Sequence, residues 1–287
     1  MPLSPPNVEL TRARPLLGTI VSIQVAHASH AMALQALEAA FAAMEQIHHA
    51  MSFQSLDSEL TAMNCLAHLE PVRVSGVTWG VLRAALALAR ASGGAFDPSI
   101  AGSIHVAQDS LLPRPDPTAC FRDVHLLPGQ RVRYARPLWL DLSGIAKGAA
   151  VDRAVSVLRA GGAFAGTVNA GGDLRVFGAR PVPILVRHPD LSQPPQALGQ
   201  LTDGAVATSA GYYGQGKHVV DPLTQRALPA GRSITVVARR AIWADALTKV
   251  VHAQGPRALG LLRRLHAEAL IFDVGQAHPW RVQAEAA

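Results

Sequence analysis

The segment 139–152 holds the residue types that could bind a phosphate. Asp141, Ser143 and Gly144 are followed closely by Lys147. The pattern predicts a strand that ends near Asp141, a turn, and a helix that opens with Lys147. A helix N-terminus presents unpaired backbone N–H groups and partial positive charge, and a lysine beside it adds a cation, so the segment suits a phosphate. A capped strand–helix junction with a surface lysine would explain the same residues, so other motifs must decide.

Four further stretches combine polar side chains with turns or helix ends. Each also has a purely structural explanation, such as a hairpin turn, a strand histidine or an acidic residue that compensates a helix dipole. Double glycines let the backbone approach a ligand closely. The stretches are Gly93-Gly-Ala-Phe-Asp-Pro98, Thr167-Val-Asn-Ala-Gly-Gly-Asp173, Val206 to Pro222 with its hydroxyls and His218, and Ala244-Asp-Ala-Leu-Thr-Lys249.

The composition limits the classes of protein that this chain can form. Of its 287 residues 49% are apolar and 16% charged, which excludes wholesale disorder and allows one large domain or two ordinary ones. No uncharged apolar run reaches the ~18 residues of a membrane span. The net charge of +6 favours anionic partners such as nucleotides. Scattered arginines and only 5% aromatic residues argue against a nucleic-acid groove.

The cysteines and the N-terminus carry little signal. Cys65 and Cys120 are far apart, so they form neither a zinc pattern nor a disulfide framework. The first ten residues lack the basic start and apolar stretch of a signal peptide, which favours a cytoplasmic location.

Apolar periodicity predicts helices separated by groups of strands. Without strict β–α–β alternation, this order favours an α+β fold with antiparallel sheets and packed helices. Asp57 or Ser58 could cap an additional helix. The expected helices are 30–51, 77–92, one from Lys147, 243–254 and 256–266; the expected strands are 17–26, 163–170, 174–177, 182–187, 218–220, 233–238 and 269–274; the segment 111–122 is expected to be a loop.

In this order and at these spacings, the motifs resemble the FAD:protein FMN transferase family, also called ApbE-like. The resemblance spans roughly Leu16 to Val274. It implies a T-fold-like α+β architecture in one domain over 1–287, with an irregular segment at 1–15. The matching elements are Leu17-Gly-Thr, Ser58-Glu-Leu to Asn64, Gly94-Ala-Phe-Asp97, Asp141-Leu-Ser-Gly-Ile-Ala-Lys-Gly148, Asn169-Ala-Gly-Gly-Asp173, Ala207-Thr-Ser, His218-Val-Val-Asp-Pro and Ala244-Asp-Ala-Leu.

The resemblance implies an enzyme that splits FAD, transfers FMN to a threonine or serine of an acceptor flavoprotein, and releases AMP. Magnesium would bridge the diphosphate, Lys147 would lie beside it, and His218 would act as the general base. The metal would be held by the carbonyl of Gly144 and the carboxylate of Asp245, with Thr248 as a possible hydroxyl ligand. The implied FAD contacts are Leu17, Ala95, Phe96, Asp97, Asp141, Lys147, Asn169, Gly171, Thr208 and Ser209.

Lys249 departs from the family pattern, which has a threonine four residues after the aspartate as a further metal ligand. Residues four apart share a helix face, so the ammonium would point at the metal position. Either Lys249 replaces part of the metal's charge, which weakens or removes magnesium dependence, or Thr248 supplies the hydroxyl. We favour the first, because Thr248 points about 100° away from that face.

Two milder departures concern Leu17 and Ala210. Leu17 stands where methionine is usual, and Ala210 is inserted between the serine and the glycine of the family's Thr-Ser-Gly motif. The alternatives to the transferase are a flavin-binding protein without transferase activity and an FAD pyrophosphatase, in which water replaces the acceptor hydroxyl.

Overall fold

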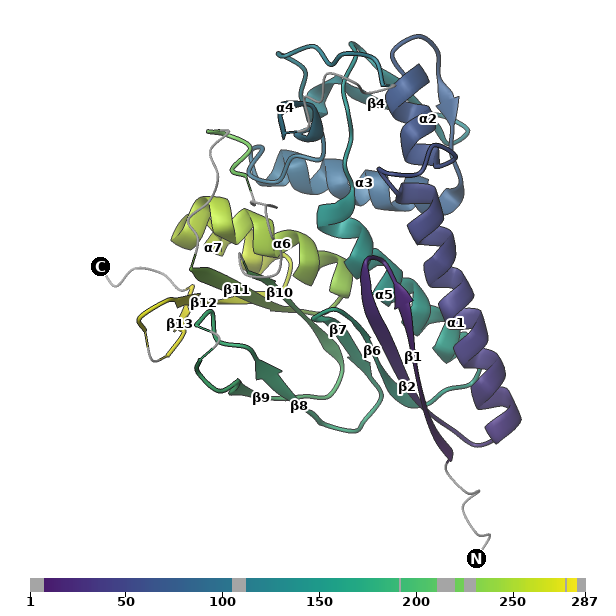
Figure 1. The fold of residues 1–287 in the computed structure, drawn as a ribbon, viewed down its shortest axis with the longest axis vertical. Coiled ribbons are helices and arrows are strands. Elements are labelled where there is room, and N and C mark those ends of the chain that lie inside the picture. The colour runs from purple at the N-terminus through teal and green to yellow at the C-terminus, as the bar shows by residue number, and fades with distance from the viewer. Residues whose placement is uncertain are drawn as a thin grey trace, which may run out of the picture. The chain divides into compact units, whose positions relative to one another are not determined.

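The computed structural model describes residues 8–104, 112–190, 192–210, 220–224, 231–276 and 278–282 (Figure 1). The described residues form two compact units that interleave in sequence. The first unit contains the described residues up to 46, those from 147 to 210, and those from 231 onward. The second contains those from 47 to 146 and 220–224. The expectation of one domain over 1–287 stays a prediction.

The first unit is built on an eight-stranded sheet in which every neighbouring pair of strands is antiparallel. A separate two-stranded hairpin, β8–β9, belongs to the same unit. In spatial order the large sheet comprises β1 (Val8–Leu16), β2 (Thr19–His27), β6 (Ala165–Ala170), β7 (Asp173–Phe177), β10 (Gly204–Ala210), β11 (Arg232–Ala238), β12 (Glu268–Asp273) and β13 (Trp280–Arg281), and the hairpin comprises β8 (Val182–Val186) and β9 (Gln196–Leu201).

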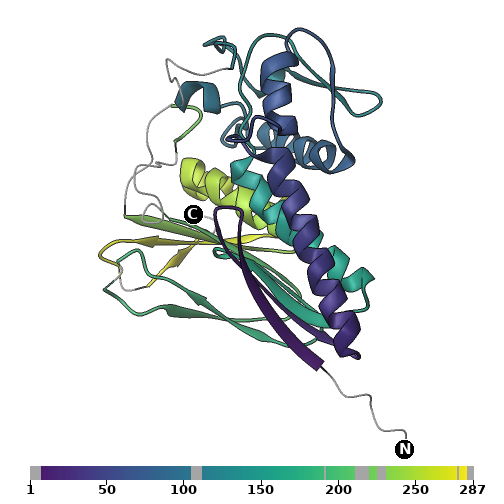
Figure 2. The same ribbon diagram turned by 45° about the vertical axis from the view of Figure 1, so that its right-hand side comes forward.

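Helix α6 (Ala241–Gln254) packs against β10 and β11. The β8–β9 hairpin lies against the opposite face of the sheet, an arrangement seen in both views (Figures 1 and 2). A small core of Ile184, Val186, Val206 and Phe272 joins the hairpin to the sheet. After α6 follow η3 (Gly255–Ala258) and α7 (Leu259–Arg264).

Helices α1 (His30–Met51) and α5 (Ser143–Ala160) contribute residues to both units. Three apolar residues of α1 at helical spacing, Leu37, Phe41 and Met44, are fully buried, as the amphipathic pattern requires. The buried carboxylate of Asp152, on α5, accepts hydrogen bonds from the first two backbone N–H groups of α6 at 3.0 and 3.2 Å. A residue of one helix therefore caps the start of the next.

The second unit consists of short helices and a small three-stranded sheet of order β3-β5-β4. Ser58 is the N-cap of α2, because its hydroxyl accepts the N–H of Thr61 at 3.0 Å. The elements are α2 (Glu59–Leu66), β3 (Val72–Arg73), α3 (Gly76–Ala91), α4 (Ala101–Ile104), η1 (Phe121–Asp123), β4 (Val124–Leu127) and β5 (Arg131–Tyr134).

The α+β prediction is confirmed, and most of the predicted elements are present within a few residues of their expected bounds. Two expectations are wrong. The segment 8–15, expected to be irregular, forms most of β1; its alternation is masked by charged residues and Pro15, which suit an edge strand. The segment before Asp141 forms no strand, only an isolated bridge between Trp139 and Ile100.

Most of the remaining differences concern short elements, and the exception is β10, a seven-residue strand between β7 and β11. Strands β3, β4, β5, β9, β10 and β13 were not expected, because several are too short to show periodicity. The predicted 256–266 helix is divided into η3 and α7. Most of the expected strand 218–220 lies outside the described residues.

Candidate active site

Helix α5 begins four residues earlier than predicted, at Ser143, so Lys147 lies in its second turn rather than at its start. The Asp141 carboxylate accepts the N–H of Ser143 at 2.7 Å, which satisfies one of the free donors at the helix start. The backbone N–H of Asp141 donates to the carbonyl of Pro98 at 2.7 Å. Asp141 therefore contacts the segment that follows the Gly94–Asp97 motif.

Within the second unit, the structure brings the Asp97 and Asp141 segments together. The bridge between Ile100 and Trp139 continues the contact made by Asp141. Asp97 accepts from the backbone N–H and the hydroxyl of Ser99 at 2.8 and 2.6 Å, and burial raises the pKa of Asp97 in spite of these bonds. Ala95 and Phe96 are 1% and 5% exposed, so their side chains offer little surface to a ligand.

Within the first unit, three predicted contact segments lie at one end of the large sheet. The β1–β2 turn consists of Leu17 and Gly18, both at positive φ, 57° and 70°. Gly171 in the β6–β7 turn also has positive φ, 64°, and a Cβ there would lie 2.5 Å from the hydroxyl of Thr19, so the two turns are adjacent. On β10, Val206 pairs with Leu174, which brings Thr208 level with the same turn.

Two of the predicted polar contacts have structural partners. The side-chain carbonyl of Asn169 accepts the N–H of Gly172 at 2.9 Å and so holds the β6–β7 turn. The Thr208 hydroxyl is hydrogen-bonded to that of Thr235 at 2.9 Å. Ser209 follows on β10 and is half-buried.

Four charged residues of the first unit form what we call the lysine–aspartate cluster: Lys147, Asp173, Asp245 and Lys249. Lys147 Nζ lies 2.6 Å from Asp173 Oδ2, and Lys249 Nζ contacts Asp245 Oδ1. The Asp245 side chain is fully buried, while the lysine side chains are 36% and 24% exposed. The cluster therefore combines buried carboxylates with ammonium groups that reach solvent.

The pKa shifts follow from this arrangement. Burial alone would lower the pKa of Lys147, but the carboxylates of Asp245 and Asp173 outweigh burial and raise it. Burial would raise the pKa of Asp245, but Lys249 and Lys147 lower it. For Asp173, burial and the neighbouring Asp245 raise the pKa in spite of Lys147. Lys147 therefore stays charged at neutral pH, which suits binding of a diphosphate.

The implied magnesium ligands do not fit a metal in this arrangement. Asp245 Oδ1 is occupied by Lys249, and Oδ2 accepts the N–H of Gly148 at 3.0 Å. The Thr248 hydroxyl donates to the backbone carbonyl of its own helix at Asp245, at 2.7 Å. Gly144, the third implied ligand, lies in the first turn of α5. In the described part of the chain, no three His, Cys, Asp or Glu side chains are grouped to hold a metal.

Two residues that help to build the site, Asp173 and Asp152, were not predicted as site residues. Asp173 directly follows the two glycines in the sequence, but only the fold shows that its carboxylate accepts a hydrogen bond from the Lys147 ammonium. Asp152 caps α6, which carries Asp245. The predicted base, His218, lies outside the described residues.

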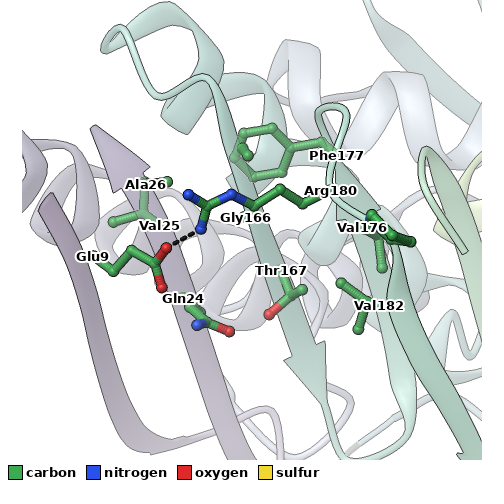
Figure 3. Close-up of a pocket in the computed structure, with 12 residues that line it drawn as sticks. Glu9, Gln24, Val25, Ala26, Gly166, Thr167, Val176, Phe177, Arg180 and Val182 are labelled. Atoms are coloured by element: carbon green, nitrogen blue, oxygen red, sulfur yellow. Dashed lines mark hydrogen bonds and ion pairs between the residues drawn. The ribbon is translucent and has the colours of Figure 1, made fainter. Parts of the chain in front are cut away.

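A cavity of about 190 Å³ lies elsewhere in the first unit, across β2, β6 and β7 and beside the start of β8 (Figure 3). An ion pair between Glu9 and Arg180 crosses it. None of the predicted site residues lines it; the lining side chains include Gln24, Thr167, Val176 and Val182.

Known structures share this fold and define the class of protein. The flavin transferase ApbE from Vibrio cholerae superposes with a TM-score of 0.78 at 23% sequence identity, over 96% of this chain and 97% of that one. The ApbE protein from Thermotoga maritima superposes with a TM-score of 0.77 at 28% identity, with the same coverage. The fold is therefore that of the ApbE flavin transferases.

The chain belongs to the ApbE family, whose pattern matches residues 17–271. An FAD:protein FMN transferase from Treponema pallidum is 29% identical, over 92% of this chain and 84% of that protein. A protein of the same name from Rhodobacter capsulatus is 26% identical, over 88% of this chain and 53% of that protein. This chain thus spans about half the length of the second relative.

None of the described helices combines the length and the apolar character that a membrane span requires.

Proposed function

We propose that this protein is an FAD:protein FMN transferase, which moves FMN from FAD to a threonine or serine of an acceptor flavoprotein and releases AMP. Family membership and the names of two relatives support the proposal. The observation that carries it is the position of Lys147. Its ammonium is held by buried Asp173, the first residue after the Gly171–Gly172 turn. A fixed cation beside an open turn suits the diphosphate of FAD.

The reaction is a phosphoryl transfer. The acceptor hydroxyl oxygen forms a bond to the phosphorus on the FMN side of the diphosphate, and the bond from that phosphorus to the bridging oxygen breaks. AMP leaves with the electron pair, and the hydroxyl proton passes to a base, the role proposed for His218. The protein mainly positions these groups and neutralises developing charge, which is the task of Lys147.

The other residues proposed as FAD contacts belong to turns and strand ends. Leu17, Gly171 and the β10 hydroxyls belong to the first unit, and Asp97 and Asp141 to the second. Since Ala95 and Phe96 are buried, they would act through their backbone. Asn169 would act by holding the glycine turn in shape. The cytoplasmic location expected from the N-terminus stays a prediction.

Intact-mass spectrometry of an acceptor flavoprotein domain, incubated with FAD and this protein, tests the proposal. We expect a mass gain equal to one FMN, lost in His218→Ala and strongly reduced in Lys147→Ala. An acceptor variant without its target hydroxyl is the control. FMN and AMP released without acceptor would indicate a pyrophosphatase, and bound FAD with no product on two different acceptors would indicate a flavin-binding protein.

A further inference from the structure

Lys249 and the buried Asp245 form a partly buried ion pair at the position where the family implies a divalent cation. The two residues are four apart on α6 and so share a face. Lys249 Nζ contacts Asp245 Oδ1 and also lies 3.1 Å from the backbone carbonyl of Asp245. A buried carboxylate is stable only with a counter-charge, and here the chain itself supplies that charge.

The lysine–aspartate cluster is electrically balanced without a metal. Its two ammonium groups match its two carboxylates, as the pairs Lys147–Asp173 and Lys249–Asp245. A divalent cation bound by Asp245 would displace Lys249 from both oxygens that it contacts. It would also add two positive charges beside two ammonium groups, so the cluster as built opposes the metal.

The other oxygens nearby are engaged as well. The Thr248 hydroxyl donates to the Asp245 carbonyl at 2.7 Å, and Asp245 Oδ2 accepts the N–H of Gly148 at 3.0 Å. Magnesium requires a near-octahedral set of oxygen ligands. In the described part of α6, every Asp245 oxygen already accepts a hydrogen bond.

The choice of lysine at this position is also informative. Of the 26 basic residues of the chain, only three are lysines, Lys147, Lys217 and Lys249, and the others are arginines. Both described lysines pair with buried aspartates of the cluster. An ammonium is a compact point charge on a flexible stem, whereas a guanidinium is a wide planar fork, so lysine is the closer substitute for a metal ion.

We propose that the Lys249 ammonium serves as a built-in cation in place of magnesium, so that this protein transfers FMN without a divalent metal. The proposal rests on the proposed transferase function. The side chain of Lys249 is 24% exposed and can reach an incoming diphosphate while its stem stays packed. In the transfer step it forms no covalent bond; it neutralises charge on the phosphates while the acceptor oxygen bonds to phosphorus and AMP departs with the electron pair.

The first test compares FMN transfer by the wild-type protein in excess EDTA and in Mg²⁺. We expect equal rates. Lys249→Thr should lose about tenfold or more in EDTA, in line with the loss of one charge-stabilising group, and should recover when Mg²⁺ is added. Arg281→Thr is a matched control, because it removes an exposed cation outside the cluster and should leave the metal response unchanged. Loss of wild-type transfer in EDTA would overturn the proposal.

The second test does not depend on activity. Mn²⁺ is titrated into the FAD-loaded protein and free Mn²⁺ is followed by electron paramagnetic resonance, with FAD alone as the reference. The wild type should bind no more Mn²⁺ than FAD alone, whereas Lys249→Thr should gain one site. If the wild-type protein with FAD binds one Mn²⁺ ion tightly, Lys249 does not replace the metal, whether or not the protein is a transferase.

The transfer assay and the Mn²⁺ titration together distinguish failure of the proposed function from failure of the role proposed for Lys249. Absence of transfer under every condition would reject the proposed function, and the Mn²⁺ titration would still decide the role of Lys249. If Lys249→Thr does not fold, both wild-type measurements remain decisive, and Lys249→Arg, which keeps the charge, should remain resistant to EDTA.

Discussion

At the scale of single residues, the structure shows which charges are held by the fold. Lys147 and Lys249 are each fixed by a buried aspartate, so substitution of either lysine affects stability as well as chemistry. A lone buried carboxylate is costly, and removal of one partner of such a pair typically destabilises a protein by about 3–5 kcal/mol. Kinetic effects of lysine variants therefore need to be measured alongside their unfolding curves.

His252, also on α6, is a second buried titratable group. It is 8% exposed, and within the described part of the chain neither ring nitrogen has a hydrogen-bond partner. Burial lowers its pKa to about 4. The backbone of Ser209 and the carboxylate of Asp273 oppose this shift, and Lys249 and Arg232 add to it.

Because the folded state holds His252 neutral, its contribution to stability is present above pH 6.5 and is lost as the pH falls toward 4. The full loss is on the order of 3 kcal/mol, at about 1.4 kcal/mol per pKa unit. Urea unfolding across this range should show a shallower decline in His252→Leu than in the wild type. Equal slopes would mean that folding does not lower the pKa of His252.

Leu17 lies at φ 57°, a conformation that suits glycine or asparagine better than leucine. We expect Leu17→Asn to raise the free energy of unfolding by about 0.5–1 kcal/mol, because it relieves backbone strain. If the leucine side chain contacts the flavin nucleotide, FAD affinity should fall by up to about tenfold through lost apolar contact.

Fluorescence titration with FAD and thermal melting measure the two effects of Leu17→Asn. Gln130→Asn is the matched control, since Gln130 has the same φ of 57° but lies in the β4–β5 turn. That variant should gain stability without a change in affinity. If Leu17→Asn binds FAD as tightly as the wild type, the Leu17 side chain does not contact FAD.

At the scale of elements, the α5–α6 contact positions the cluster, because α5 carries Lys147 and α6 carries Asp245 and Lys249. Their close approach depends on Gly148. A Cβ at that position would lie 2.2 Å from the carbonyl oxygen of Ala241 and 2.8 Å from the Cα of Ile242, both backbone atoms that cannot easily move.

Gly148→Ala should therefore destabilise the protein by about 1–3 kcal/mol or more, as overpacking does, and should weaken FAD binding by disturbing Asp245. Gly80→Ala provides the comparison, since Gly80 is also helical but a Cβ there meets nothing within 4 Å. That change should stabilise α3 by about 0.5–1 kcal/mol. Chemical denaturation of both variants measures the difference; similar stabilities would contradict the close contact.

At the scale of the whole molecule, a ligand that binds only the folded state stabilises it by mass action. FAD at about one hundred times its Kd should add about 2.7 kcal/mol to the free energy of unfolding. FMN or AMP alone, each with half of the contacts, should raise the melting temperature less.

Differential scanning calorimetry with each nucleotide tests this expectation. Lys147→Ala should reduce the shift with FAD, whereas Arg281→Thr, which removes an exposed pair, should retain it. No shift at saturating FAD would argue against an FAD site of any kind.

Local sequence patterns were enough to predict the α+β class, the helices 30–51 and 77–92, and the order of the motifs, because apolar periodicity and turn residues are local signals. The sequence also identified Lys249 as the departure from the family. It did not indicate β1, whose charged residues and Pro15 suit an edge strand, or the start of α5 at Ser143, which depends on a capping contact.

The pairing of charged residues became visible only in the folded chain. Lys147 and Asp173 are 26 residues apart, and Gly148 and Asp245 are 97 apart. No local pattern encodes such pairs, because they arise when helix α5 packs between a strand end and helix α6. The sequence raised two possibilities for Lys249; the burial of Asp245 and the occupation of its oxygens favour the ammonium over a metal.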